Sequence, residues 1–392
     1  MEISSYLCLR NSNNNKNMKM KNILLTLALA ACTMGAAAQQ DNIQTFTFDN
    51  PYTVEKIKAP KGKKVKNVVL MIGDGMSLMH IQAAWTCNRG HLWLENAQAT
   101  GLSETPATDR LVTDSGSGGT SLATGYKTVY HAVGVDPQGK PLTTLIDLAK
   151  QAGKYAGVAV TCRLWDATPG DFLGHNIDRD FEEDIVGCYP ESNVDFVFGG
   201  GFRKFIQRKD GRNIFNELEA KGYHISRTID EKMSYDNARQ WCVPFEVDTP
   251  LPDERGDMLA RASVRGMDLM SKNKKGFFMM IEGSQLDDYG HFNDLPMLMK
   301  ETLDFDHTIG EVFKWAARDG ETLVVITADH ETGGLTVHGG DLATGTVKGN
   351  FSSKDHTGTM VPVYAFGPGS ENFTGFYSNT EIFWKIKRLM NM

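Results

Sequence analysis

The sequence predicts an α/β fold, a three-layer sandwich with a large, mostly parallel central sheet and helices on both faces. Short apolar runs rich in Val, Ile and Phe recur along the chain, and helical patterns lie between them. Buried parallel strands have continuous apolar sequences, and strands that alternate with helices form a sheet covered on both faces. Gly is frequent (39 residues) and Pro is scarce (13), as expected where many tight turns join regular elements.

Six segments have the apolar pattern of buried parallel strands: 67–72, 156–161, 194–198, 277–281, 322–327 and 361–366. Four segments have apolar residues at helical spacing: 142–151, 258–270, 302–317 and 381–390. Residues 202–252 are more polar and less periodic, so we predict a surface excursion there. Residues 332–355 are rich in Gly and Thr and are predicted to form a second surface loop.

The N-terminal segment has the order of features found in a secretory signal. Basic Lys19 and Lys21 precede an apolar run over 23–31, and small residues end at Ala38. The run is too short to span a bilayer. We therefore predict a signal peptide over residues 1–38 and an exported, periplasmic protein with no transmembrane segment. The alternative is a lipoprotein anchored through Cys32.

Charge and composition restrict the partners. The chain carries 41 Lys+Arg and 48 Asp+Glu, a formal charge of −7. Residues 1–38 hold four basic residues and one acid, so their removal takes the charge to −10. A chain this acidic is not expected to bind nucleic acid. A composition of 41% hydrophobic and 23% charged residues is that of a globular protein, which excludes disordered, collagen-like and coiled-coil classes.

The chain beyond residue 38 contains four cysteines: Cys87, Cys162, Cys188 and Cys242. Three pairings are available to them in an oxidising compartment, and their spacing does not choose among the three. None forms a CxxC pair, so a thiolate zinc site is not expected.

Carboxylates follow three of the predicted strands. Asp74 comes after 67–72, Glu282 after 277–281, and Asp329 with His330 after 322–327. The carboxyl ends of parallel strands lie along one edge of an open sheet, where ligands bind. Crowded carboxylates repel one another, and a bound cation relieves that repulsion. The sequence therefore predicts a metal site at this edge.

Further candidate ligands follow Glu282 and precede the last strand. Asp287 and His291 are four residues apart, one helical turn, so both can face one ion. His356 lies just before 361–366. Imidazole and carboxylate ligands together favour zinc, with a coordination position left open for catalysis.

Two more segments suggest phosphate chemistry. Ser115 opens a Gly-rich stretch that runs into a helical pattern, a setting in which a hydroxyl and backbone N–H groups can meet a phosphate. The stretch matches neither the P-loop nor the dinucleotide fingerprint, which argues against those sites. Thr168, next to Asp166, offers oxygen ligands for magnesium, and Arg179 offers a fork for phosphate oxygens.

Together these segments resemble the alkaline phosphatase family. The motifs occur in the family's order and extend over residues 67–367: Ile72-Gly73-Asp74-Gly75-Met76, Thr113-Asp114-Ser115, Asp166-Ala167-Thr168-Pro169, Glu282-Gly283-Ser284-Gln285-Leu286-Asp287 with His291, Thr327-Ala328-Asp329-His330, and His356-Thr357-Gly358. The resemblance implies that residues 39–392 form an alkaline phosphatase-like catalytic domain.

The resemblance also implies an activity and a set of site residues. The enzyme would hydrolyse small phosphate monoesters to alcohol and inorganic phosphate through a phosphoserine at Ser115, using two zinc ions and one magnesium. One zinc would be bound by Asp287, His291 and His356. The second would be bound by Asp74, Asp329 and His330, with Ser115 as a further ligand. Magnesium would be bound by Asp74, Thr168 and Glu282. Arg179 would bind phosphate, Asp114 would orient that Arg, and Asp166 would act through magnesium-bound water.

Two features of the sequence depart from the family pattern. Asp288 stands where relatives often carry Lys, His or Trp. The spacing between His330 and His356 is short for the segment that forms the dimer interface in larger relatives, so a homodimer is left open.

Two other functions are alternatives. A phosphodiesterase of the same superfamily would lack counterparts of Arg179, Thr168 and Glu282. A non-catalytic exported phosphate- or metal-binding protein would not need the hydroxyl of Ser115.

Overall fold

Ten strands form the central sheet of the protein, for which we use a computed structural model that describes residues 42–60, 64–228 and 239–392. The order across the sheet is β15-β3-β14-β9-β2-β8-β4-β5-β7-β6. In that order the strands span Gly375–Ser378, Ala99–Glu104, Val361–Phe366, Thr322–Thr327, Asn67–Gly73, Phe277–Gly283, Tyr155–Arg163, Phe196–Gly200, Gln240–Cys242 and His224–Ser226. The predicted signal peptide, with Cys32, lies outside the described residues.

The sheet is mostly parallel, with one reversed strand. β2 pairs in parallel with β9 and β8, and β4 continues the parallel arrangement toward β5. β14 is antiparallel to both of its neighbours, with Tyr364 opposite Ile326 and Val363 opposite Gly101. The prediction that this strand is parallel is therefore wrong. A strand buried on both faces is continuously apolar in either direction, so its sequence does not reveal its direction.

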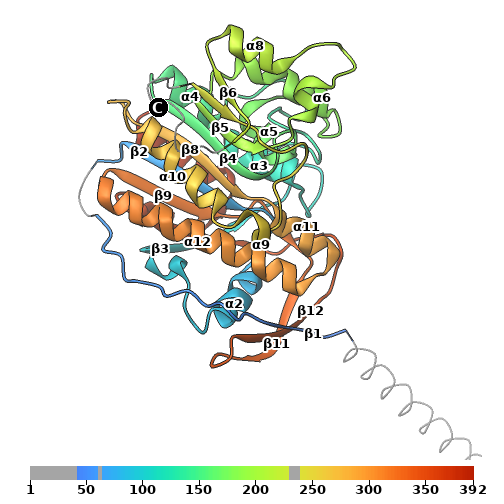
Figure 1. The fold of residues 1–392 in the computed structure, drawn as a ribbon, viewed down its shortest axis with the longest axis vertical. Helices are drawn as coiled ribbons and strands as arrows, with labels where there is room; N and C mark the ends of the chain where they lie inside the picture. Colours follow the sequence, from blue (N-terminus) through green and yellow to red (C-terminus); the bar gives the residue numbers. More distant parts are fainter. Residues whose placement is uncertain (1–41, 61–63, 229–238) are drawn as a thin grey trace, which may run out of the picture. The chain divides into compact units, whose positions relative to one another are not determined.

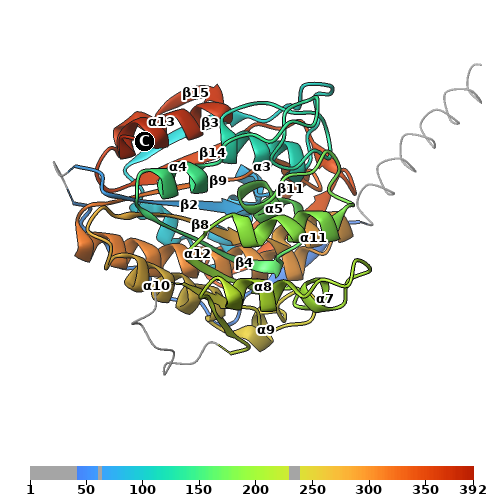
Figure 2. The same cartoon turned by 90° about the horizontal axis from the view of Figure 1, so that it is seen from above.

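Helices cover both faces of the sheet, and residues 45–392 form one compact unit. One face packs against α2 (Leu78–Cys87), α10 (Met258–Met270) and α12 (Leu295–Asp319). The other packs against α3 (Ser115–Thr124), α4 (Leu145–Gln151), α5 (Ala167–Leu173) and α13 (Thr380–Met390). Figure 2 shows α12 and α10 on one side of the strands and α4 and α13 on the other. The predicted three-layer α/β fold is confirmed.

Successive side chains of the central strands pack alternately against the two faces of the sheet. Val68 and Leu70 of β2 belong to the core under α4 and α13, whereas Val69 and Met71 belong to the core under α12. All four are fully buried. Because both faces of β2 are apolar, the strand has the continuous hydrophobic run seen in the sequence.

Both predicted surface segments contain regular structure. Residues 202–252 include α7 (Arg203–Ile206), α8 (Ile214–Ala220), the edge strand β6 and its neighbour β7, and Trp241 of β7 is fully buried. Residues 332–355 form a hairpin of β11 (Leu335–Asp341) and β12 (Thr346–Phe351), with an irregularity after Val337. Strands this short, or with polar exposed faces, lack the apolar run by which strands were recognised, so both loop predictions need this correction.

The remaining elements are short: β1 (Gln44–Thr47), α6 (Glu182–Cys188), α9 (Pro252–Arg255), α11 (Gln285–Phe292), β10 (Glu331–Thr332), β13 (His356–Thr357), and 3-10 turns at Trp93–Asn96, Tyr189–Glu191 and Ser370–Phe373. Cys87, Cys162, Cys188 and Cys242 are free thiols. Within the described ranges, no helix has the length and apolar character needed to cross a membrane.

Candidate functional site

Four neighbouring strands bring carboxylates to one edge of the sheet. β9, β2, β8 and β4 lie side by side and parallel (Figure 1). Asp74 directly follows β2, and Glu282 lies near the end of β8, paired in register with Ile72. Asp329 lies two residues beyond β9, and Asp166 three residues beyond β4. The predicted convergence of acids at the carboxyl edge is observed.

Gly75 allows the chain after β2 to pass close to its neighbours. Its φ is +69°, a left-handed conformation that side chains other than Gly rarely adopt. A Cβ at this position would lie 2.6 Å from Oγ1 of Thr332 and 3.0 Å from Oδ1 of Asp287. Gly75 is therefore required for Asp74 and Asp287 to share one site.

Asp287, His291 and His356 form the first cluster. Nε2 of His291 lies 3.2 Å from Oδ2 of Asp287 and 3.1 Å from Nε2 of His356, which in turn lies 3.5 Å from Oδ1 of Asp287. The other ring nitrogens are engaged by backbone carbonyls, 2.8 Å from Lys354 O and 2.8 Å from Thr113 O. This arrangement, with one nitrogen oriented by a carbonyl and the other free for a cation, is typical of metal-binding histidines.

Asp74, Asp329 and His330 form the second cluster, which Ser115 joins. Nε2 of His330 lies 3.2 Å from Oδ2 of Asp329, 3.4 Å from Oδ1 of Asp74 and 3.2 Å from Oγ of Ser115. All four residues are buried, and burial lowers the pKa of His330 to about 4. A neutral imidazole is the form that binds a metal ion.

The two clusters are contiguous. Asp287, His330 and His356 bring ligand atoms within 4.8 Å of one another, and so do Asp74, Asp329 and His330. The rings of His330 and His356 are stacked, with centroids 3.7 Å apart. His330 therefore lies between the two sets of candidate ligands.

Glu282 lies near Asp74 of the second cluster, and Thr168 lies near Glu282. Glu282 is fully buried and Thr168 is 1% exposed. Burial, followed by the charges of Asp166 and Asp329, raises the pKa of Glu282 to about 8. Burial and the charge of Asp329 likewise raise the pKa of Asp74. Ionised carboxylates are thus strongly disfavoured here in the protein alone.

Four oxygens at this edge are buried and accept no hydrogen bond within the described part of the chain: Asp74 Oδ1, Thr168 Oγ1, Glu282 Oε1 and Asp329 Oδ2. Buried polar atoms without partners are costly. Divalent cations would satisfy these oxygens and relieve the repulsion among the carboxylates. The donor set fits the predicted metals, with imidazole and carboxylate for zinc and oxygen alone for magnesium.

Ser115 is the first residue of α3, and Asp114 caps that helix. The Asp114 carboxylate accepts hydrogen bonds from the backbone N–H groups of Gly116 (3.3 Å) and Ser117 (3.1 Å). The Ser117 hydroxyl also donates to Asp114 at 2.8 Å. This capping places Ser115 Oγ at the positive end of the helix dipole, next to His330.

The glycines of α3 serve packing rather than anion approach. A Cβ on Gly118 would lie 2.9 Å from the carbonyl oxygen of Asp329, and one on Gly119 would lie 2.1 Å from Oδ2 of Asp171 in α5. Both positions are filled by protein atoms. The sequence-based interpretation of this Gly-rich stretch as room for a phosphate is therefore wrong for these two residues.

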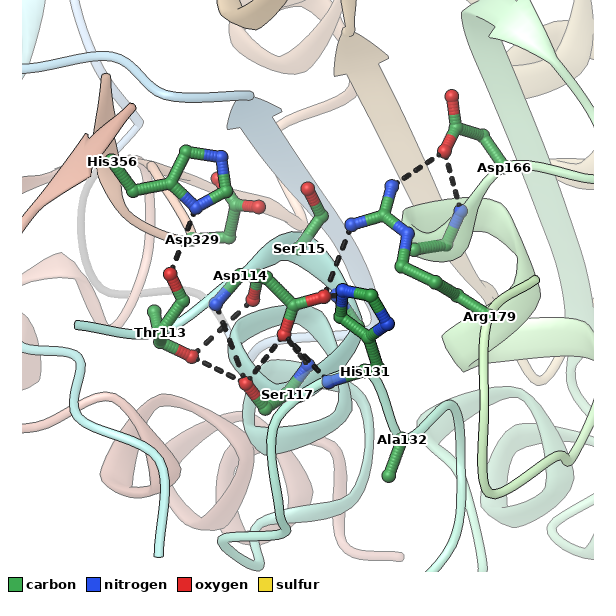
Figure 3. Close-up of polar contacts among 12 residues, drawn as sticks. Thr113, Asp114, Ser115, Ser117, His131, Ala132, Asp166, Arg179, Asp329 and His356 are labelled. Carbon is green, nitrogen blue, oxygen red and sulfur yellow. Dashed lines mark hydrogen bonds and ion pairs between the residues drawn. The ribbon is translucent and has the colours of Figure 1, made fainter. Parts of the chain in front are cut away.

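Arg179 bridges two of the predicted site carboxylates (Figure 3). Its Nη1 donates to Oδ2 of Asp114 at 3.1 Å and its Nη2 to Oδ1 of Asp166 at 2.8 Å. Although burial alone would raise it, the pKa of Asp114 is lowered to about 2 by Arg179 and by hydrogen bonds from His131 and Ser117. The guanidinium is thus held in one orientation near Ser115.

Sequence reasoning missed several polar residues at the site. Thr332 donates its hydroxyl to Asp287 and lies 3.1 Å from Nδ1 of His330. The His131 N–H donates to Asp114 at 3.1 Å. Arg163 and Asp248 extend the ion pairs of Asp166. No local pattern identifies such residues, although Thr332 lies only two residues after His330.

Residues 65–350 match the sequence model of the family described as alkaline phosphatase. The chain belongs to the alkaline phosphatase family. It is similar to alkaline phosphatase 4 of Bacillus subtilis, 31% identical with 83% of this chain and 89% of that protein covered. It is also similar to alkaline phosphatase H of Pseudomonas aeruginosa, 30% identical with coverage of 84% and 86%.

Solved structures of alkaline phosphatases are also similar to this chain. The alkaline phosphatase of the Antarctic bacterium TAB5 is 34% identical and has a TM-score of 0.79, covering 86% of this chain and 99% of its own. Variants of that enzyme have been solved with Mg bound in the M3 site. The predictions of the family, of the fold and of a phosphomonoesterase are confirmed.

Proposed function

We propose that the enzyme hydrolyses phosphate monoesters through a phosphoserine formed at Ser115. The observation that supports this most directly is the position of the Ser115 hydroxyl. It lies at the start of α3, 3.2 Å from His330 Nε2 in the second cluster, on the side where Arg179 is held between Asp114 and Asp166. A nucleophile, a cation site and an anion-binding group thus meet at one point.

The three predicted metal sets are retained in this proposal: Asp287, His291 and His356 for one zinc; Asp74, Asp329 and His330 for the other; Asp74, Thr168 and Glu282 for magnesium. When bound, these cations supply positive charge that lowers the pKa of the hydroxyl and water nucleophiles and stabilises the leaving oxygen. Magnesium in the TAB5 variants supports the third assignment.

The protein groups then have distinct tasks. Ser115 Oγ releases its proton to solvent and attacks phosphorus, which forms the Ser–O–P bond and breaks the bond to the alcohol oxygen, and that oxygen takes up a proton from solvent as it leaves. A water molecule cleaves the phosphoserine in a second displacement and restores the hydroxyl. Arg179 has five N–H donors, of which two engage Asp114 and Asp166, so three remain for phosphate oxygens. Asp166 would act through water bound to magnesium.

The proposal is tested with p-nitrophenyl phosphate at alkaline pH. We expect Ser115→Ala to lower kcat by about 10³-fold or more, because the covalent route is lost. Ser117→Ala is the matched control, since its hydroxyl bonds Thr113 and Asp114 and none of the predicted metal ligands, and we expect less than a tenfold loss. Acid quenching after reaction with ³²P-labelled substrate should trap label on the wild type and on Ser117→Ala, but not on Ser115→Ala. Preference for bis-p-nitrophenyl phosphate would instead indicate a phosphodiesterase, and phosphate binding without turnover a binding protein.

We also propose that residues 39–392 are the exported catalytic domain. The support is the signal-like order of residues 1–38. N-terminal sequencing of the mature protein tests it, with Gln39 expected as the first residue. Palmitate labelling of a chain that begins at Cys32 would favour the lipoprotein alternative.

A further inference from the structure

Arg163, at the end of β4, makes ion pairs on both sides. Its Nη2 lies 3.0 Å from Oδ2 of Asp166, and its Nη1 lies 3.2 and 3.3 Å from the two carboxylate oxygens of Asp248. Its backbone N–H also donates to Asp248 at 2.8 Å. The charges of Asp166 and Asp248 outweigh burial and raise the pKa of Arg163.

Asp248 lies in a loop that is fixed to the sheet. The next residue, Thr249, donates through its N–H (3.2 Å) and its hydroxyl (2.8 Å) to the carbonyl of Thr161 in β4. Gln285, at the start of α11, donates to the carbonyl oxygens of Thr161 and Thr249 at 2.8 and 3.0 Å. All three supporting residues are at most 5% exposed. The Asp248 carboxylate is therefore a stationary anchor for Arg163.

Five charged groups consequently form one ion-pair chain: Asp248, Arg163, Asp166, Arg179 and Asp114. The two oxygens of Asp166 are divided between the arginines, Oδ2 to Arg163 and Oδ1 to Arg179. Oδ1 also accepts from the N–H of Ala167 at 2.8 Å. Arg163 thus holds one carboxylate oxygen of Asp166, and the other oxygen faces the guanidinium of Arg179.

We propose that Arg163, anchored by Asp248, is a positioning residue that sets phosphate affinity by holding Asp166 against Arg179. The proposal rests on the proposed role of Arg179 in binding phosphate.

Arg163 affects anion binding in two ways, through the position of Asp166 and through the balance of its charge. Without Arg163, Oδ2 of Asp166 loses its cationic partner and only the contacts of Oδ1 hold the carboxylate, so its support of Arg179 is weaker. The charge of Asp166 is then balanced by one arginine instead of two, beside the already crowded Glu282. Both changes weaken the binding of an anion.

The experiment compares the metal-loaded wild type with Arg163→Gln, Arg163→Lys and Asp248→Asn. For Arg163→Gln we expect the inhibition constant of inorganic phosphate and the KM for p-nitrophenyl phosphate to rise about fivefold, with kcat changed less than threefold. Lys restores the charge but cannot pair with both acids at once, so Arg163→Lys should lie between. Asp248→Asn should raise the same constants about twofold. Loss of folded protein would lower kcat and leave these constants unchanged.

A double-mutant cycle tests the route through Asp166. We expect Arg163→Gln to have no further effect on phosphate inhibition when introduced into Asp166→Asn. Arg261→Gln, which removes an exposed arginine paired with Asp257 at 3.6 Å, is the control and should change nothing. An unchanged inhibition constant in Arg163→Gln, or effects of the two substitutions that multiply, would overturn the proposal.

Calorimetric titration with inorganic phosphate provides the same comparison without turnover. If the wild type failed to hydrolyse monoesters, the proposed function would fail, yet the binding cycle would still show whether Arg163 acts through Asp166. If hydrolysis were normal and the binding constants of Arg163→Gln and wild type were equal, only the role of Arg163 would be refuted.

Discussion

Carboxylates at the carboxyl edge of the sheet fall into two groups with opposite environments. Asp114 and Asp166 are paired with Arg179, and the pKa of Asp114 is lowered to about 2. Asp74 and Glu282 have oxygens without hydrogen bonds, and burial followed by repulsion from neighbouring acids raises the pKa of Glu282 to about 8. Residues of one chemical type, within one site, thus titrate in opposite directions.

The difference lies in the source of the positive charge. At the guanidinium of Arg179 the protein supplies its own cation, so Asp114 is ionised and both of the paired carboxylates are held in place before any ligand arrives. At the cluster of Asp74 and Glu282 no Lys or Arg of the described residues makes an ion pair with these acids, so the anions depend on bound cations for close partners. The fork is therefore preorganised, whereas the metal cluster depends on its ions.

Removal of metal should disrupt the cluster of Asp74 and Glu282 and leave the ion pairs of Arg179 intact. We expect EDTA dialysis to reduce hydrolysis of p-nitrophenyl phosphate by about 10³-fold or more, since metal charge contributes several kcal/mol to the transition state. Zinc plus magnesium should restore the rate, and each added alone should restore less. Elemental analysis of the native protein should find about two zinc and one magnesium per chain. Full activity after exhaustive chelation would contradict the metal assignment.

Substitution of Arg179 should lower activity less than removal of the metals does. We expect Arg179→Gln to lower kcat/KM by about 10²-fold, the usual size for one transition-state donor group. Arg179→Lys should lose nearly as much, because an ammonium cannot engage Asp114, Asp166 and phosphate in the same geometry. Arg212→Gln, at an exposed pair with Glu217, is the control. Steady-state kinetics with p-nitrophenyl phosphate measure all three, and a harmless Arg179→Gln would exclude the fork from phosphate binding.

Much of this site could be predicted from the sequence because its parts follow regular elements. Asp74, Glu282 and Asp329 each end a recognisable apolar run, and the parallel arrangement of those strands brings them together. Asp287 and His291 share a helical turn, a local rule that needs no knowledge of the fold.

The rest depends on contacts that leave no local pattern. The pair between Arg163 and Asp248 joins residues far apart in the chain through a loop whose position is set by Thr249. The reversed strand β14 has the same apolar sequence in either direction. The glycines of α3 look like a ligand loop until the neighbouring Asp171 is seen to occupy the space. Each of these features becomes visible only in three dimensions.

The opposite pKa shifts predict opposite pH responses of the metal-free protein. The pKa of Glu282 is about 8 in the folded state, above its ordinary value of 4.5. The folded state therefore binds the extra proton between about pH 4.5 and 8, and stability from this group is lost as pH rises through that range. We expect a loss on the order of 5 kcal/mol by urea unfolding in EDTA, which Glu282→Gln should largely remove and bound metal should abolish. Glu219→Gln, at an exposed position, should retain the wild-type slope.

Asp114 should respond in the other direction and by a smaller amount. Its folded pKa of about 2 lies below its ordinary value of 3.8, so its contribution is complete above about pH 4 and is lost as pH falls toward 2. The difference between 3.8 and about 2 corresponds to about 2 kcal/mol. In the same metal-free protein we expect Asp114→Asn to flatten the acid limb of the stability curve between pH 4 and 2, while Asp49→Asn, an exposed control, leaves it steep. If Asp114→Asn flattened the curve above pH 5 instead, the fork would not be ionised in the folded protein, and the division of this site into self-paired and metal-dependent acids would be wrong.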